Sequence, residues 1–368
     1  MLRRTLTIPL AIAVSACAGG PGSADRQTAL QLAKQDIAFR ENARTYSQFT
    51  VARYASLTDD PEVAADNYAK VARQSPEDSA IAERAVFSAL LVGDVPGAVA
   101  LAKQTSPETR ADTELVRLTL AVDAIATGQP ETALSYLEQP WASTYHATLA
   151  RSLAAWSALE TDPVTAIDLQ RQAGSTDPVL SGVAGTLAAI MKLQTGDETR
   201  AIADLDALWQ SGARLAIGTY AYAQQRAGSG EEEAALRRLQ AFHDTVGRNP
   251  ALDALAEDIR SGAVSTRQPL STREGIALAF YAATAALANQ DRGDLPSVYF
   301  ALTLHLDPQL DAARTLWADT LDSANRRPEA IALLQQVSEA SVYHTNAQGQ
   351  LAWALRREGR NQEALDLA

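Results

Sequence analysis

Side chains that commonly do chemistry are few in this chain and stand far apart in its sequence. None of the four histidines has a second histidine four residues away, which is the helical spacing that many metal sites use. They are His146, His243, His305 and His344. The chain also has no GxSxG, P-loop or dinucleotide fingerprint. The sequence therefore predicts no metal site, no cofactor and no catalytic constellation.

Two groups of polar residues are explained better by structure than by catalysis. Glu231, Glu232 and Glu233 stand where a helix is expected to begin, and carboxylates there interact favourably with the helix dipole. His305 lies in an apolar helical segment, so we expect it to be packed or hydrogen-bonded within the core. The five tryptophans are scattered and do not form the cluster typical of a sugar-stacking site. We predict a protein that is not an enzyme.

The single cysteine, Cys17, lies in an N-terminal segment of recognisable composition, MLRRTLTIPLAIAVSACAGG. Two arginines precede an apolar stretch over residues 5–14, which is too short to span a bilayer. An ordinary secretory signal with an incidental cysteine is one interpretation. Residues 14–17, VSAC, resemble the lipobox of bacterial lipoproteins, in which the cysteine is lipidated after cleavage. The resemblance implies a signal peptide over residues 1–16 and, since Ala18 is not aspartate, sorting to the outer membrane.

Composition excludes two classes of partner. The formal net charge is −12 and the pI is about 4.9, whereas nucleic acids and anionic lipid surfaces require a basic face. Aromatic residues make up only 6% of a chain that is rich in alanine and leucine, which favours helix. We therefore expect a helical protein that does not bind nucleic acid.

A period of about 34 residues runs through residues 45–368. The clearest unit is SAIAERAVFSALLVGDVPGAVALAKQ, residues 79–104, where Gly93 is placed to end one helix and Pro96 suits the first turn of the next. Small residues in both helices allow them to approach closely. These spacings resemble those of the tetratricopeptide-repeat (TPR) family. The resemblance implies an all-α solenoid of about nine helix-turn-helix units.

The repeat is interrupted at residues 251–272, where residues 253–260 could be helical and the remainder is typical of a loop. We predict a lipidated stem and polar helix over 17–44, about six repeats over 45–250, and about three over 273–368. This layout resembles uncharacterised TPR lipoproteins of alphaproteobacteria. The last unit is about ten residues short of a full repeat. We therefore expect the sequence to be a fragment of a longer protein, a frayed terminus being the alternative.

In the TPR family, the first helix of each unit lines a concave surface. Carried over to this sequence, the resemblance implies a largely apolar groove that binds a partner. Its residues are Phe49, Phe87, Leu90, Leu91, Leu118, Val122, Ile125, Ile190, Leu193, Tyr220 and Tyr281. Such a groove fits an amphipathic helix or an extended peptide. The alternative is that a tightly wound superhelix buries these side chains in its own packing.

Together these features predict a non-catalytic protein-interaction scaffold, attached by lipid at Cys17 to the periplasmic face of the bacterial outer membrane. Its partners would be envelope proteins. One alternative is the accessory region of an enzyme whose catalytic module lies beyond residue 368. Another is a polysaccharide-secretion protein, in which such repeats precede an outer-membrane barrel.

Overall fold

All regular structure is helical in the part of the chain that the computed structural model describes, residues 23–174, 177–264, 268–288 and 294–367. The chain divides into two units, residues 1–48 and residues 49–368. Everything discussed below lies in the second unit. No helix among the described residues is long and apolar enough to cross a membrane.

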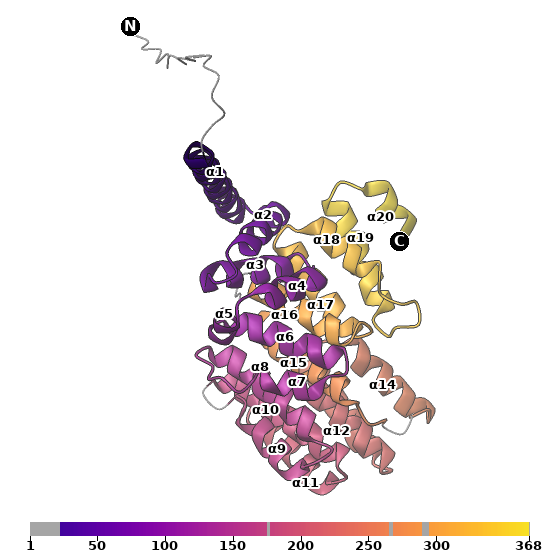
Figure 1. The fold of residues 1–368 in the computed structure, drawn as a ribbon. Helices are drawn as coiled ribbons and strands as arrows, with labels where there is room; N and C mark the ends of the chain where they lie inside the picture. Colours follow the sequence, from indigo (N-terminus) through magenta and orange to yellow (C-terminus); the bar gives the residue numbers. More distant parts are fainter. Residues whose placement is uncertain (1–22, 175–176, 265–267, 289–293, 368) are drawn as a thin grey trace. The chain divides into compact units, whose positions relative to one another are not determined.

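Successive helices pair as hairpins along the first part of the chain (Figure 1). The pairs are α3 (Ser79–Leu91) with α4 (Val95–Gln104), α6 (Glu114–Ala126) with α7 (Pro130–Ser135), α8 (Thr144–Ala158) with α9 (Pro163–Gln172), α10 (Pro178–Gln194) with α11 (Glu198–Gln210), and α12 (Ala216–Gly228) with α13 (Glu232–Thr245). The helices α1 (Ser23–Leu57) and α2 (Pro61–Gln74) precede these pairs, and α2 packs on α3. The short helix α5 (Pro107–Asp112) follows α4. The predicted repeat is thus confirmed as a series of helical hairpins.

The single helix α14 (Pro250–Ser261) follows, and three more pairs complete the fold. These are α15 (Thr272–Ala288) with α16 (Leu295–Leu306), α17 (Asp311–Ser323) with α18 (Arg327–Leu334), and α19 (His344–Arg357) with α20 (Asn361–Leu367). The helix expected within the interruption is therefore present as part of α14, and the described residues after it, 262–264 and 268–271, are not helical.

Local sequence explains where these helices begin and end. Gly93 ends α3 with a φ of 77°, a conformation that costs glycine little because it has no Cβ. The Asp94 side chain then accepts a hydrogen bond from the Gly97 amide at 2.9 Å and caps α4. Pro96 occupies the first turn of α4, and Pro296 occupies the first turn of α16. Since proline lacks only an amide that has no helical partner there, both positions tolerate it.

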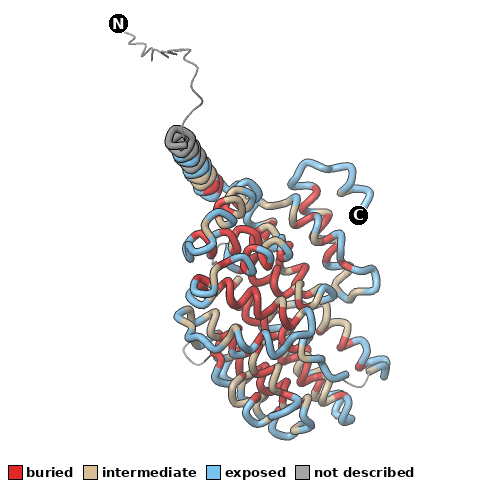
Figure 2. Tube along the Cα trace, in the orientation of Figure 1, coloured by how far each residue is buried: buried red, intermediate tan, exposed pale blue. Residues whose placement is uncertain are grey.

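Hairpin α15–α16 packs back onto the earlier helices and does not begin a separate array. α15 lies against α8 and α10, while α16 lies against α3 and α6 (Figure 1). Gly275 on α15 makes the approach possible, because a Cβ at this position would overlap the indole of Trp156 on α8. The main core is consequently continuous from the first hairpins to α19 (Figure 2).

This packing corrects the expectation of an open groove along the first array. α15–α16 occupies that face, so seven of the predicted groove residues are buried in the core. They are Leu90, Leu91, Leu118, Val122, Ile125, Ile190 and Leu193. Leu90, Leu118 and Val122 have no exposed surface, and no partner can reach them in this structure. Most of the predicted groove is therefore buried by the protein's own packing, which is the alternative given above.

Candidate functional site

A cavity of about 490 Å³ lies where α10, α12, α14 and α15 meet the loops that precede α15, α17 and α19. We call it the tyrosine pocket, after Tyr220, Tyr281 and Tyr343. Its apolar lining is formed by Ile190, Ala216, Ile217, Ala221, Ala251, Leu252, Leu270, Leu278, Leu310, Ala312 and Val342. Its polar lining is formed by Gln194, Gln224, Asn249, Gln268, Gln309, Asp311 and Ser341 together with the three phenols.

The three tyrosines are uncharged at physiological pH. Burial raises the pKa of Tyr281 well above its usual value of 10, and the neighbouring Tyr343 adds to the shift. Burial likewise raises the pKa of Tyr343 to about 12, although a hydrogen bond with Asn249 opposes the change. Burial and then the charge of Asp258 raise the pKa of Tyr220. Each phenol therefore keeps its proton and can donate a hydrogen bond.

The remaining polar lining is almost entirely neutral. Gln194 accepts a hydrogen bond from the Leu270 amide at 3.2 Å, but its Nε2 is buried and has no partner among the described residues. Asp311 is the only ionisable lining group besides the phenols, and it pairs with Arg314 at 3.1 Å. An apolar cavity with neutral donors and acceptors suits an uncharged ligand surface, such as an apolar side chain with its backbone amides.

The structure brings together three of the predicted groove residues, Ile190, Tyr220 and Tyr281, in this pocket. Phe87 and Leu91 line a different cavity, described below. Phe49 packs edge-on against Tyr68 with ring centroids 6.2 Å apart, and Leu90, Leu118, Val122, Ile125 and Leu193 belong to the core. These five residues are buried and do not form a partner-binding surface in this structure, whereas a role of Phe49 in partner binding stays a prediction. Cys17 lies outside the described residues.

The sequence did not indicate the other side of the pocket. Asn249, Leu270, Val342 and Tyr343 lie in or next to segments between helical pairs, whereas the groove was predicted from first helices only. The segments that hold Leu270, Val342 and Tyr343 lie near Tyr220 because α15 packs on α8 and α10 and α17 packs on α15. In the sequence alone, a tyrosine next to a turn, such as Tyr343, does not indicate a pocket, because the helices that complete the pocket are not known.

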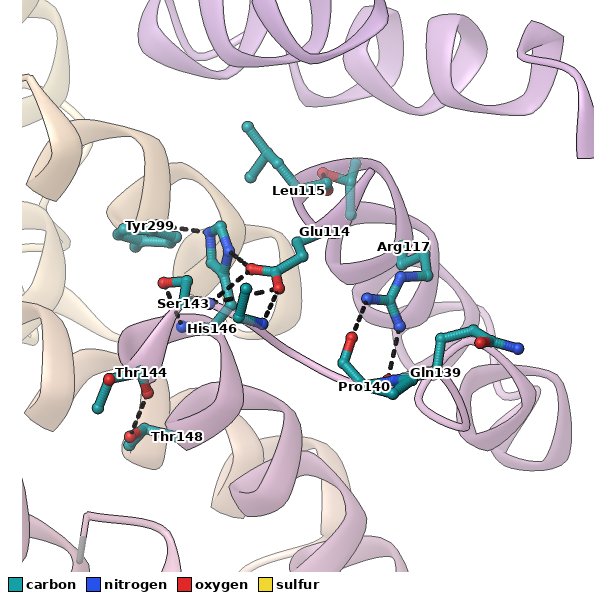
Figure 3. Close-up of polar contacts among 12 residues, drawn as sticks. Glu114, Leu115, Arg117, Gln139, Pro140, Ser143, Thr144, His146, Thr148 and Tyr299 are labelled. Atoms are coloured by element: carbon teal, nitrogen blue, oxygen red, sulfur yellow. Dashed lines mark hydrogen bonds and ion pairs between the residues drawn. The ribbon is translucent and has the colours of Figure 1, made fainter. Parts of the chain in front are cut away.

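A second polar arrangement involves His146, and it joins three elements (Figure 3). Nδ1 of His146 lies 2.8 Å from Oε2 of Glu114 on α6, and Nε2 lies 2.8 Å from the hydroxyl of Tyr299 on α16. Glu114 also accepts hydrogen bonds from the backbone amides of Ala142 and Ser143. We call Glu114, His146 and Tyr299 the histidine bridge.

Glu114, His146 and Tyr299 are residue types found in acid–base catalytic sites, but the ring nitrogens of His146 are not available to a substrate. A general base needs a ring nitrogen that can reach a substrate proton, and both nitrogens of His146 are engaged by protein groups. Arg117 supports the same loop by donating to the carbonyls of Gln139 and Pro140 at 2.9 Å each (Figure 3). The bridge therefore connects α6, α8 and α16 structurally.

The other polar residues agree with the structural interpretations made from sequence. Nε2 of His305 lies 3.3 Å from Oδ1 of Asp123, which confirms a hydrogen-bonded histidine. Glu231 precedes α13 and pairs with Arg226 at 2.7 Å. No group of three or more His, Cys, Asp or Glu residues suited to a metal ion occurs in the described parts of the chain.

No family model matches the chain, and no curated protein matches it. Among solved structures, the TPR domain of P58(IPK) is 13% identical, covers 86% of this chain and 99% of its own, and has a TM-score of 0.25. Yeast Tom70 is 12% identical, covers 93% of this chain and 91% of its own, and has a TM-score of 0.29. These similarities are too weak to define the fold, which follows from the helical hairpins themselves. They define an all-α, TPR-like solenoid.

Proposed function

We propose that the protein is a non-catalytic scaffold that binds a segment of a partner protein in the tyrosine pocket. The observation that carries this proposal is the pocket itself, an apolar cavity of about 490 Å³ with three neutral phenols and several amides around it. Its volume falls in the range of about 300–1,000 Å³ that is usual for binding pockets. An apolar side chain can fill it while the phenols and amides bind the adjoining backbone.

The proposal also includes the lipid anchor and the envelope location, which are supported by the resemblance of residues 14–17 to a lipobox. Attachment at Cys17 would hold the scaffold at the periplasmic face of the outer membrane. A tether raises the effective concentration of a partner that is also held in the envelope, so modest pocket affinity is sufficient. We expect the partner to be an envelope protein.

Replacing Cys17 by alanine tests the anchor. The wild-type protein is expected in the outer-membrane fraction with an acylated N-terminal cysteine, because lipid provides its attachment. The Cys17→Ala protein is expected to be absent from that fraction or to retain residues 1–16. Membrane fractionation and mass spectrometry of the N-terminus give both readouts. An unlipidated wild-type protein, or identical fractionation of the two proteins, would contradict the anchor.

A negative charge at the mouth of the tyrosine pocket tests the binding site. Val342 and Leu270 line the pocket and remain 53% and 37% exposed, so neither is needed for the core. We expect a photocrosslinking residue at position 270 to give an adduct with one envelope protein. Val342→Glu should reduce that adduct about tenfold, because binding would bury an unpaired carboxylate. Mass spectrometry identifies the adduct, and the purified partner then gives a Kd.

Val179→Glu is the matched control. Val179 is 47% exposed and stands at the start of α10, eleven residues before Ile190, so a charge there leaves the pocket unchanged. Both variants should retain wild-type helical circular dichroism and melting. If the adduct survives Val342→Glu, or is lost equally with Val179→Glu, the tyrosine pocket is not the binding site.

A further inference from the structure

A second cavity, of about 790 Å³, lies between the α1–α2 turn, α3 and the α17–α18 turn. We call it the acidic groove, because Asp59, Asp60, Glu83 and Asp294 line it. It shares no lining residue with the tyrosine pocket. The two cavities are therefore separate candidate sites.

Carboxylates in the acidic groove outnumber guanidinium groups two to one, since Arg84 and Arg326 are its only basic lining residues. Arg326 is already paired with Glu329, which lies 3.0 Å away and outside the lining. Asp59 and Glu83 make no ion pair with any described residue. The groove therefore carries an excess of negative charge that no ion pair among the described residues neutralises.

The floor of the acidic groove is apolar and aromatic. Phe87 is half-buried there, beside Leu91 and the buried ring of Tyr68. One donor on the wall also lacks a partner: Arg326 donates through Nη2 to the Leu91 carbonyl at 3.1 Å, but its buried Nη1 has no acceptor among the described residues. Because this nitrogen is buried, it is not part of the surface that a bound peptide meets.

We propose that the acidic groove binds a protein segment in which lysine or arginine residues flank an apolar residue. The cationic groups would pair with Asp59 and Glu83, while the apolar side chain would contact Phe87. Charge complementarity selects this occupant over an acidic or neutral segment. The acidic groove and the tyrosine pocket are formed by different residues, so an experiment that refutes binding at one site leaves the other proposal unaffected.

Fluorescence anisotropy with two labelled peptides tests this proposal on the full chain. In one peptide lysines flank leucine pairs, and in the other every lysine is replaced by glutamate. We expect only the lysine peptide to bind, with affinity falling as sodium chloride rises from about 20 to about 200 mM, because exposed charges are screened. The double variant Asp59→Asn/Glu83→Gln should weaken binding about three- to tenfold.

This variant removes two charges with little change in shape, and asparagine tolerates the positive φ of 55° at position 59. The matched control is Glu232→Gln/Glu233→Gln, which makes the same change in net charge on the exposed face of α13. The control should keep wild-type affinity for the lysine peptide. No binding of that peptide, equal binding of both peptides, or equal weakening in both variants would overturn the proposal.

Discussion

Gly275→Ala is expected to lower the free energy of unfolding by about 3 kcal/mol, an overpacking effect at the upper end of the usual range. The added Cβ would overlap the indole of Trp156, a rigid side chain that is only 1% exposed. Neither α8 nor α15 can move freely, since α8 also packs on α9 and α15 also packs on α16. Urea denaturation followed by circular dichroism measures the change.

Gly349→Ala is the matched control for this prediction. Gly349 also lies inside a helix, α19, but a Cβ there meets no atom within 4 Å. Because alanine is the better helix former, this variant should be unchanged or more stable by up to about 1 kcal/mol. If Gly275→Ala unfolds at the same urea concentration as the control, the close approach of α15 to α8 is not as described.

The Gly275→Ala substitution should also disturb the lining of the tyrosine pocket. α15 carries Leu278 and Tyr281 into that pocket, so displacement of this helix moves part of the lining. The hairpin α15–α16 also borders the acidic groove through Asp294, which directly precedes α16. The hairpin α15–α16 thus borders both the tyrosine pocket and the acidic groove.

Glu114→Ala is expected to lower the free energy of unfolding by about 2–3 kcal/mol near neutral pH. The substitution leaves the Ser143 amide and His146 without the carboxylate that binds them at 3.2 Å and 2.8 Å. It also frees the side of His146 opposite Tyr299, so the histidine bridge no longer connects α6 with α16. Chemical denaturation at several pH values measures this contribution.

The contribution of Glu114 should depend on pH in a defined direction. Burial raises the pKa of Glu114, but hydrogen bonds from His146, Ala142 and Ser143 together with the charge of His146 outweigh burial, and the net pKa lies below the usual 4.5. A carboxyl whose folded pKa is lowered stabilises the protein above its unfolded pKa. That stabilisation is lost as the pH falls through the folded pKa.

The difference between wild type and Glu114→Ala should therefore shrink when the pH is lowered from about 7 to below about 4.5. Glu138→Ala is a suitable control, because Glu138 is exposed on the loop before α8. Its effect on stability should be within about 0.5 kcal/mol at every pH. A difference for Glu114→Ala that stays constant across this range would show that the ionised carboxylate is not what stabilises the bridge.

The sequence by itself determined the helices and their turns. Gly93, Pro96 and Pro296 act within one turn of their own positions, and the apolar spacing of each helix depends on residues three or four apart. These features are local, so they can be inferred without knowing which helices later meet. The sequence also placed residues such as Leu118 and Ile190 on one common face, which was expected to be a concave, partner-binding groove.

Only the tertiary structure decided what that face contacts. The contacts of Gly275 with Trp156, of Tyr299 with His146 and of Arg326 with the Leu91 carbonyl join residues more than one hundred positions apart. The repeat spacing is the same whether α15–α16 continues an open solenoid or folds back onto the first helices. Burial of apolar surface between distant helices, which no local pattern encodes, turned the predicted groove into core and left the tyrosine pocket and the acidic groove beside it.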